Sequence, residues 1–338
     1  MAAQPDAVRV AAAADTEWLR RRGPGWLVVA GKELAETLTS LRFAVLLVIL
    51  GLAALAPVYA TSGAIRDAAE QASGAAALFL ALFTLGADPV PSFVGLVGFV
   101  APLLGIAFGF DAINGERAQG TLARLLSHPI HRDDLINGKF AAGLAAIAFA
   151  VVSMALLVAG LGIVRLGIVP SVGEVARMLA WVVVTILYIG LWLAIAMLCS
   201  VLSRRAATSA LIAIGLWLAL SLFGVLLAQL IAGFLDPISG SVGTEAALRH
   251  AQLQQQLSIV NPGTVYAQAT LALLNPGATA VVVPGLAEAI QLSQQIPTQL
   301  SLQQSLLIVW PQVVGLLAAM VLCFVASYIV FLRQEVRA

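Results

Sequence analysis

Six stretches of the chain are long, apolar and free of Asp, Glu, Lys and Arg, and they limit what it can fold into. A helix needs about 20 apolar residues to cross the hydrocarbon core of a bilayer. Each stretch meets or approaches this length, so we expect six transmembrane helices. The predicted spans cover about 43–60, 92–110, 140–163, 179–199, 207–231 and 305–332.

The amino-acid composition also indicates a membrane protein. Hydrophobic residues make up 61% of the chain and charged residues only 10%. Soluble domains carry about 25% charged residues, and disordered chains need low hydrophobicity and high charge. Both classes are therefore excluded, and we predict an all-α, polytopic membrane protein. The net charge of +1 gives no indication of a nucleic-acid partner.

The positive residues predict the direction of the spans. If both termini are cytoplasmic, all but four of the 18 Lys and Arg residues fall on the cytoplasmic side. The four that fall outside are Arg66, Arg165, Arg177 and Arg249. Positive residues concentrate on the cytoplasmic side of membrane proteins. We therefore expect a multi-pass protein of the cell (inner) membrane with cytoplasmic N- and C-termini.

The segments before the first span and after the last are expected to be cytoplasmic. Residues 1–22 predict a mobile tail, and 333–338 a short one. Between them and the spans, 23–42 predicts an amphipathic helix, because leucines recur at three- to four-residue spacing beside Lys32 and Glu33. Such a helix lies in the membrane interface. It either anchors the first span or also has a mechanical role.

Two further segments are expected on the outer side. The apolar run Ala75–Ala87 is too short to span and suits a re-entrant or interfacial helix. The segment 232–304 combines glutamines and prolines with apolar clusters, and short helices are predicted at 244–257 and 264–274. We expect a folded outer cap of short helices there, which faces water or a periplasmic or extracellular partner. The alternative is a flexible tether between the fifth and sixth spans.

The chain lacks the motifs of a self-contained enzyme. No HExxH, CxxC, GxSxG or GxxxxGK[ST] pattern occurs, and all three histidines lie outside the predicted spans. Ion-coupled carriers normally keep a few charged residues within the membrane, and these predicted spans contain no carboxylate and no lysine. We therefore expect no catalytic residue, metal or cofactor in this chain. If it moves a substrate uphill, the energy should come from a partner.

The loop between the second and third spans has the most specific pattern. A short amphipathic helix is predicted from Gly120 to Ser127, with an apolar ridge that includes Leu125. Pro129 ends it. An apolar ridge between charges suits a helix that docks into a groove of a soluble partner. The alternative is a helix that lies on lipid headgroups.

From Asp111 to Phe140 the loop reads D-x-I-x-x-E-x-x-x-G-T-L-x-x-L-L-S-x-P-I-x-R, then five residues and G-K-F. This pattern resembles that of ABC-2-type transporter permeases, most of all the group associated with nitrous oxide reductase maturation. Lys32-Glu33-Leu34 before the first span is a weaker match. The resemblance implies an ABC-2 (type V) exporter-like fold in which an ATPase receives this loop as its coupling helix. The implied docking residues are Gly120, Thr121, Leu122, Arg124, Leu125, Leu126, Ser127, Pro129 and Ile130.

The resemblance also gives the nearby charges a role. Asp111, Glu116 and Arg117 follow the second span, while Lys32 and Glu33 precede the first. They would lie on the path from the ATPase to the gate. Glu116 would pair with Arg117, Arg124 or a basic residue of the partner. The alternative is that these are ordinary interfacial charges.

The implied function is the transmembrane subunit of an ATP-driven ABC-2 exporter. Two ATPase subunits would bind ATP and Mg. A second permease copy, in a homodimer, or a related chain would complete the pathway through the lipid. Two rivals remain. One is an ion-coupled secondary transporter, which the uncharged spans disfavour, and the other is a non-transporting membrane scaffold that holds a soluble partner.

Overall fold

The computed structural model describes residues 24–71, 78–86, 90–120, 131–167, 169–235, 249, 252–254, 256–275 and 301–334. Within these ranges the regular elements are all helices, which confirms the all-α prediction. Six helical segments are long and apolar enough to cross a membrane, again counting only the described residues. They are Leu41–Gly63, Phe93–Ala118, Arg132–Arg165, Val172–Leu202, Ala206–Phe223 and Leu302–Arg333.

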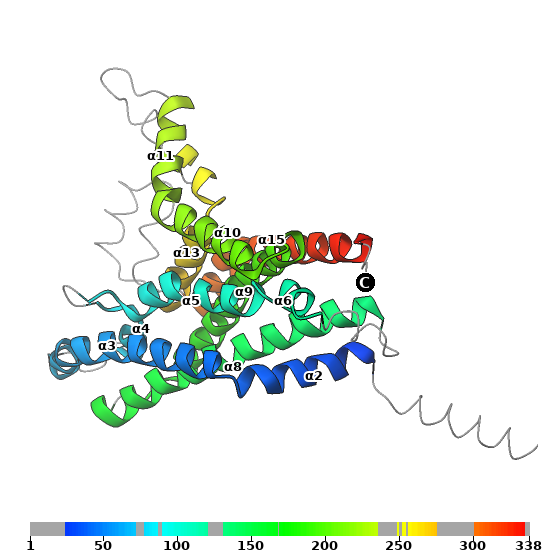
Figure 1. Ribbon diagram of the computed structural model, residues 1–338. Coiled ribbons are helices and arrows are strands. Elements are labelled where there is room, and N and C mark those ends of the chain that lie inside the picture. The colour runs from blue at the N-terminus through cyan, green and yellow to red at the C-terminus, as the bar shows by residue number, and fades with distance from the viewer. Residues whose placement is uncertain are drawn as a thin grey trace, which may run out of the picture.

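The helices follow one another along the chain as labelled in Figure 1. The first half contains α2 (Gly25–Leu38), α3 (Leu41–Gln71), α4 (Leu78–Thr84), α5 (Phe93–Gly109), α6 (Asn114–Ala118) and α8 (Arg132–Leu166). The second half contains α9 (Val172–Leu202), α10 (Ala206–Leu218), the π-helical turn η1 (Ala219–Phe223), α11 (Gly224–Leu235), α13 (Pro262–Leu274) and α15 (Leu302–Arg333).

Helix α9 is the centre of the bundle, with α5, α8, α10, α13 and α15 packed around it. Its closest approach to α5 depends on two glycines four residues apart. A Cβ atom at Gly105 would lie 2.9 Å from the Leu193 nitrogen, and one at Gly109 would lie 2.7 Å from the Leu193 oxygen. Small residues at this spacing let membrane helices pack backbone against backbone. This contact sets the position of the second span against the fourth.

Helices α2 and α3 follow α8 along its length (Figure 1). A Cβ atom at Gly138 would lie 2.6 Å from Val29, so the start of α8 and α2 are in close contact. Further along both helices, the Arg165 guanidinium lies 5.3 Å from the centre of the Tyr59 ring. The contacts advance together, so the chain runs in the same direction through both. An interfacial position for α2 stays a prediction.

Two short helices complete the core. Helix α4 has seven residues, and its Phe79, Leu82 and Phe83 side chains are fully buried. Helix α13 buries Tyr266 and Leu273 among α5, α9 and α15. It forms where the sequence predicted a helix at 264–274. That this helix belongs to an outer cap stays a prediction, and residues 276–300 lie outside the described part.

The fifth span differs from the single helix predicted at 207–231. A π-helical turn at Ala219–Phe223 separates α10 from α11, and α11 leaves the body of the bundle in a new direction (Figure 1). Helices bend where a π-helical turn interrupts their hydrogen-bond ladder. The hydropathy pattern could not reveal this bend, because Leu, Ala and Phe suit either geometry.

Candidate coupling site between α2, α6 and α8

The segment with the most specific pattern begins directly after the second span. Helix α6 carries Glu116 and Arg117, and Gly120 follows it with φ of 67°, a backbone conformation that favours glycine. The α-helical geometry of α6 therefore does not continue through Gly120. The remaining predicted docking residues all fall in 121–130, outside the described part of the chain, and α8 begins at Arg132.

Helix α6 is tied to the central helix by its first backbone groups. The hydroxyl oxygen of Ser200 on α9 accepts hydrogen bonds from the Ile113 nitrogen at 3.0 Å and the Asn114 nitrogen at 3.2 Å. The first N–H groups of a helix have no partner within the helix, so a side-chain acceptor here satisfies two of them. Ser200 is buried, so these hydrogen bonds fix the start of α6 against α9 away from water.

Lys139 joins three helices. Its ammonium nitrogen lies 3.0 Å from a carboxylate oxygen of Glu33 on α2 and 2.7 Å from one of Glu116 on α6. The Lys139 side chain is only 8% exposed. A charge removed from water needs partners of opposite charge, and removal of one partner is strongly destabilising. Lys139 therefore holds α2 and α6 against α8.

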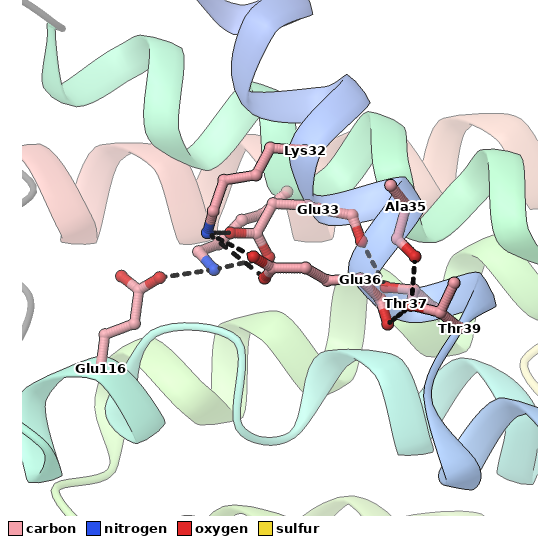
Figure 2. Close-up of polar contacts among 8 residues, drawn as sticks. Lys32, Glu33, Ala35, Glu36, Thr37, Thr39 and Glu116 are labelled. Atoms are coloured by element: carbon pink, nitrogen blue, oxygen red, sulfur yellow. Dashed lines mark hydrogen bonds and ion pairs between the residues drawn. The ribbon is translucent and has the colours of Figure 1, made fainter.

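Lys32 extends this cluster along α2. Its ammonium nitrogen lies 3.1 Å from Glu36 and 3.7 Å from Glu33. Burial lowers the pKa of Lys32, but the hydrogen bond to Glu36 and the neighbouring carboxylates outweigh this effect and raise its pKa above the ordinary value. Figure 2 shows Lys32 and Glu33 on α2 facing Glu116. Because Lys32 is more than half exposed, its pairs add little stability.

A second ion pair crosses between the first and second spans. A guanidinium nitrogen of Arg42, at the start of α3, lies 2.5 Å from the Asp111 carboxylate, just after α5. The same guanidinium lies 5.8 Å from the centre of the Phe110 ring. The Arg42 side chain is mostly exposed, so this pair guides the approach of the two helices more than it stabilises them.

The end of α15 joins the same region. Arg117 donates a hydrogen bond to the side chain of Gln334, which in turn donates to the Val201 oxygen at 3.0 Å. Arg132 donates to the backbone oxygen of Gln334 at 3.2 Å. Helices α6, α8, α9 and α15 are thus connected at one end of the bundle.

A cavity of about 980 Å³ lies between α2, α5, α6 and α8. Its walls carry both sets of ion pairs and contain apolar residues of the spans. The charged residues of the wall are Lys32, Glu33, Glu36, Arg42, Asp111, Glu116 and Lys139. Open space beside a charged contact leaves room for the helices to shift relative to one another.

The structure brings some of the predicted charges together and separates others. Glu33 and Glu116 meet on Lys139, whereas Asp111 and Arg117 have other partners. Lys139 was not among the predicted site residues, although it belongs to the G-K-F end of the pattern. The sequence prediction counted it only as a topology charge. The available signal for Lys139 was its place directly after Gly138, the glycine that lets α2 approach α8.

The comparisons with known proteins decide the family. The model of the ABC-2 family transporter protein matches residues 27–336. The chain belongs to the ABC-2 transporter family. It is similar to two proteins named "Probable ABC transporter permease protein NosY", with 42% identity in Pseudomonas aeruginosa and 39% in Stutzerimonas stutzeri. Each match covers 67 residues, which is 20% of this chain and 24% of the relative.

These findings confirm the resemblance and make this ABC-2 protein a multi-pass membrane protein and a transporter subunit. The family implies an ABC ATPase partner and permeases that are usually dimeric. Since the matched part spans about a quarter of the curated relatives' length, what those proteins transport is not carried over.

Proposed function

We propose that this chain is the transmembrane subunit of an ATP-driven ABC-2 exporter and that a separate ATPase docks on residues 120–130. The observation that carries the proposal is the position of Lys139, whose ion pairs join α2 to α6 and α8, the two helices that flank the docking segment in the sequence. A scaffold that only holds a soluble partner needs no such connection between the loop and several spans.

The geometry suggests how a push on the loop would reach the spans. Residues 121–130 are joined covalently to α6 on one side and to α8 on the other. Lys139 carries a displacement to α2 through Glu33, and Ser200 carries it to α9. Closure of the ATPases would therefore move α2, α6, α8 and α9 together. Asp111 and Arg42 would guide the end of the second span against the first.

The proposed assembly contains two ATPase subunits, which bind ATP and Mg, and two copies of this chain. The placement of the termini and the docking loop in the cytoplasm is supported by the concentration of Lys and Arg on that side. Six spans per copy are consistent with a pathway formed between two copies.

Co-purification of the ATPase tests the docking surface. Leu125→Asp places a charge on the predicted apolar ridge, where an unpaired buried charge is costly. We expect the variant to insert and fold but to lose the ATPase, whereas Leu125→Met keeps it. If Leu125→Asp retains the ATPase as well as the unchanged protein does, 120–130 is not the docking surface. If no ATPase accompanies the unchanged chain, the proposed function itself fails.

A further inference from the structure

Helix α13 is fixed to the body of the bundle along its length. At its middle, the Tyr266 hydroxyl accepts a hydrogen bond from the Trp181 ring nitrogen at 3.1 Å and lies 3.1 Å from the Thr185 hydroxyl. At its end, the Arg177 guanidinium donates to the Leu273 oxygen at 3.1 Å. These partners all belong to the central helix α9. Helix α13 is therefore a rigid neighbour of the fourth span.

Helix α11 is held differently. Among the described elements, it packs chiefly on the adjoining π-helical turn. Its large side chains are exposed, with Leu230 at 62% and Phe234 at 89%, whereas the small residues Ala228 and Ala232 are buried. Among the described elements, the turn η1 is thus the main connection between α11 and the bundle.

One side chain connects η1 to α13. The Asn261 side-chain oxygen accepts a hydrogen bond from the Gly263 nitrogen at 2.9 Å and so caps α13. The Asn261 side-chain nitrogen donates to the Leu220 oxygen within η1 at 3.0 Å. The Leu220 oxygen also accepts a hydrogen bond from the Gly224 nitrogen, where the chain returns to α-helical geometry. Asn261 is 7% exposed, so water does not compete freely for these bonds.

Gly224 makes room for this contact. A Cβ atom at position 224 would collide with the Asn261 side-chain nitrogen and lie 3.1 Å from its Cγ. In contrast, Cβ atoms at Gly215 and Gly233, in α10 and α11, would meet nothing within 4 Å. A residue without a side chain is therefore required at 224 for the Asn261 amide to reach η1.

We propose that η1 is a hinge in the fifth span and that Asn261 is the positioning residue that latches it to α13. A π-helical turn is a weak point in a helix, and a single neutral hydrogen bond contributes little net free energy. Such a latch holds α11 in the resting state and yields to a larger movement. Only the assignment of that movement to transport rests on the proposed function.

Distances between spin labels test the latch in the full-length protein in lipid nanodiscs. One pair joins Leu230→Cys on α11 to Leu307→Cys on α15, both exposed. The control pair joins Ala267→Cys on α13 to Leu307→Cys. The native thiols, Cys199 and Cys323, are first changed to Ala. With the native residues at 224 and 261, each spin-label pair should give one narrow distance distribution.

Two variants break the latch in independent ways. Asn261→Ser keeps a capping oxygen for α13 but removes the donor to Leu220. Gly224→Ala leaves Asn261 intact and displaces its amide. We expect both to lose the single narrow distance of the α11 pair while the α13 pair stays unchanged. Gly215→Ala and Gly233→Ala should leave both pairs unchanged.

Two results would overturn the latch. One is an unchanged α11 distance in both variants, and the other is equal broadening of the control pair, which would make Asn261 a folding residue of α13.

Transport is tested separately, by trapping the complex with ATP and vanadate. In that state the α11 distance should shift in the unchanged hinge. A co-purified, active ATPase without such a shift would refute the hinge while leaving the proposed function intact.

Discussion

The two ends of the bundle are held together by different chemistry. At the end where α2, α6 and α8 meet, Lys139 joins helices through ion pairs with Glu33 and Glu116. Around α13, Tyr266 joins helices through neutral hydrogen bonds to Trp181 and Thr185. Ion pairs beside an open cavity can exchange partners when helices shift. The buried ring and hydroxyl contacts of Tyr266 are instead fixed by close packing, and the Arg177 guanidinium at the end of α13 is held by the Leu273 oxygen.

The contacts that Tyr266 makes around α13 are also more completely buried. The Tyr266 ring stacks on Tyr188 with centroids 4.4 Å apart and an angle of 10° between planes. The Tyr188 hydroxyl donates to the Gly98 oxygen at 3.0 Å, which extends the contact to α5. Burial raises the pKa of Tyr266, so its hydroxyl stays neutral across the physiological range. The difference suggests a fixed frame at this end and a movable connection at the other.

The largest expected loss of stability comes from replacing Tyr266. Tyr266→Ala removes a stacked, fully buried ring and should lower the free energy of unfolding by about 3–5 kcal/mol, as for other buried aromatic residues. Thermal unfolding in detergent, followed by Trp fluorescence, measures the change. Tyr266→Phe keeps the stack and should cost less. Equal losses in the two variants would show that the hydroxyl, not the ring, holds α13.

The next effect is on the ionic connection. Lys139→Met removes the buried cation that Glu33 and Glu116 share and should lower stability by roughly 3 kcal/mol. Adding Glu33→Gln and Glu116→Gln removes the two charges left without it. The triple variant should recover its melting temperature but not ATP-driven movement. If it recovers both, the ion pairs serve stability alone.

The contact that places α2 on α8 should be less costly to disturb. Gly138→Ala forces a methyl group against Val29, and such overpacking costs about 1–3 kcal/mol. The matched control is Gly160→Ala on the same helix, where a Cβ atom meets nothing within 4 Å. Melting temperatures of the two variants give the comparison. A Gly138→Ala protein as stable as the control would show that α2 is held by its charges rather than by close packing.

The smallest effect is expected for the exposed pair. Arg42→Gln removes the contact with Asp111, and exposed pairs contribute about 0–1 kcal/mol. Its melting temperature should therefore change little, and added salt should erase the difference. A loss as large as that of Lys139→Met would remove the distinction between buried and exposed pairs at this end.

The sequence was informative wherever one physical requirement dominates. The six apolar lengths predicted the spans, because a bilayer admits little else. The short, proline-bounded run at 75–87 was not counted among the predicted spans, and within it the structure describes the seven-residue helix α4. The loop pattern from Asp111 to Phe140 predicted the family, which the match over 27–336 confirms.

What the sequence could not predict depends on which helices meet. Lys139 finds Glu33 only because Gly138 lets α2 approach α8. Asn261 finds Leu220 only because the fifth span contains a π-helical turn. Neither contact leaves a periodic pattern in the chain. The docking role of 120–130 stays a prediction.

The most direct test of the central claim is whether ATP moves α2 through Lys139. Spin labels at Gly31→Cys on α2 and Gly215→Cys on α10 occupy open positions, where a side chain meets nothing within 4 Å. In the complex with its ATPase, trapping with ATP and vanadate should change this distance. The change should disappear in the triple variant Lys139→Met, Glu33→Gln, Glu116→Gln, with the ATPase still bound. An unchanged distance in the native complex, or the same change in the variant, would contradict coupling through these ion pairs.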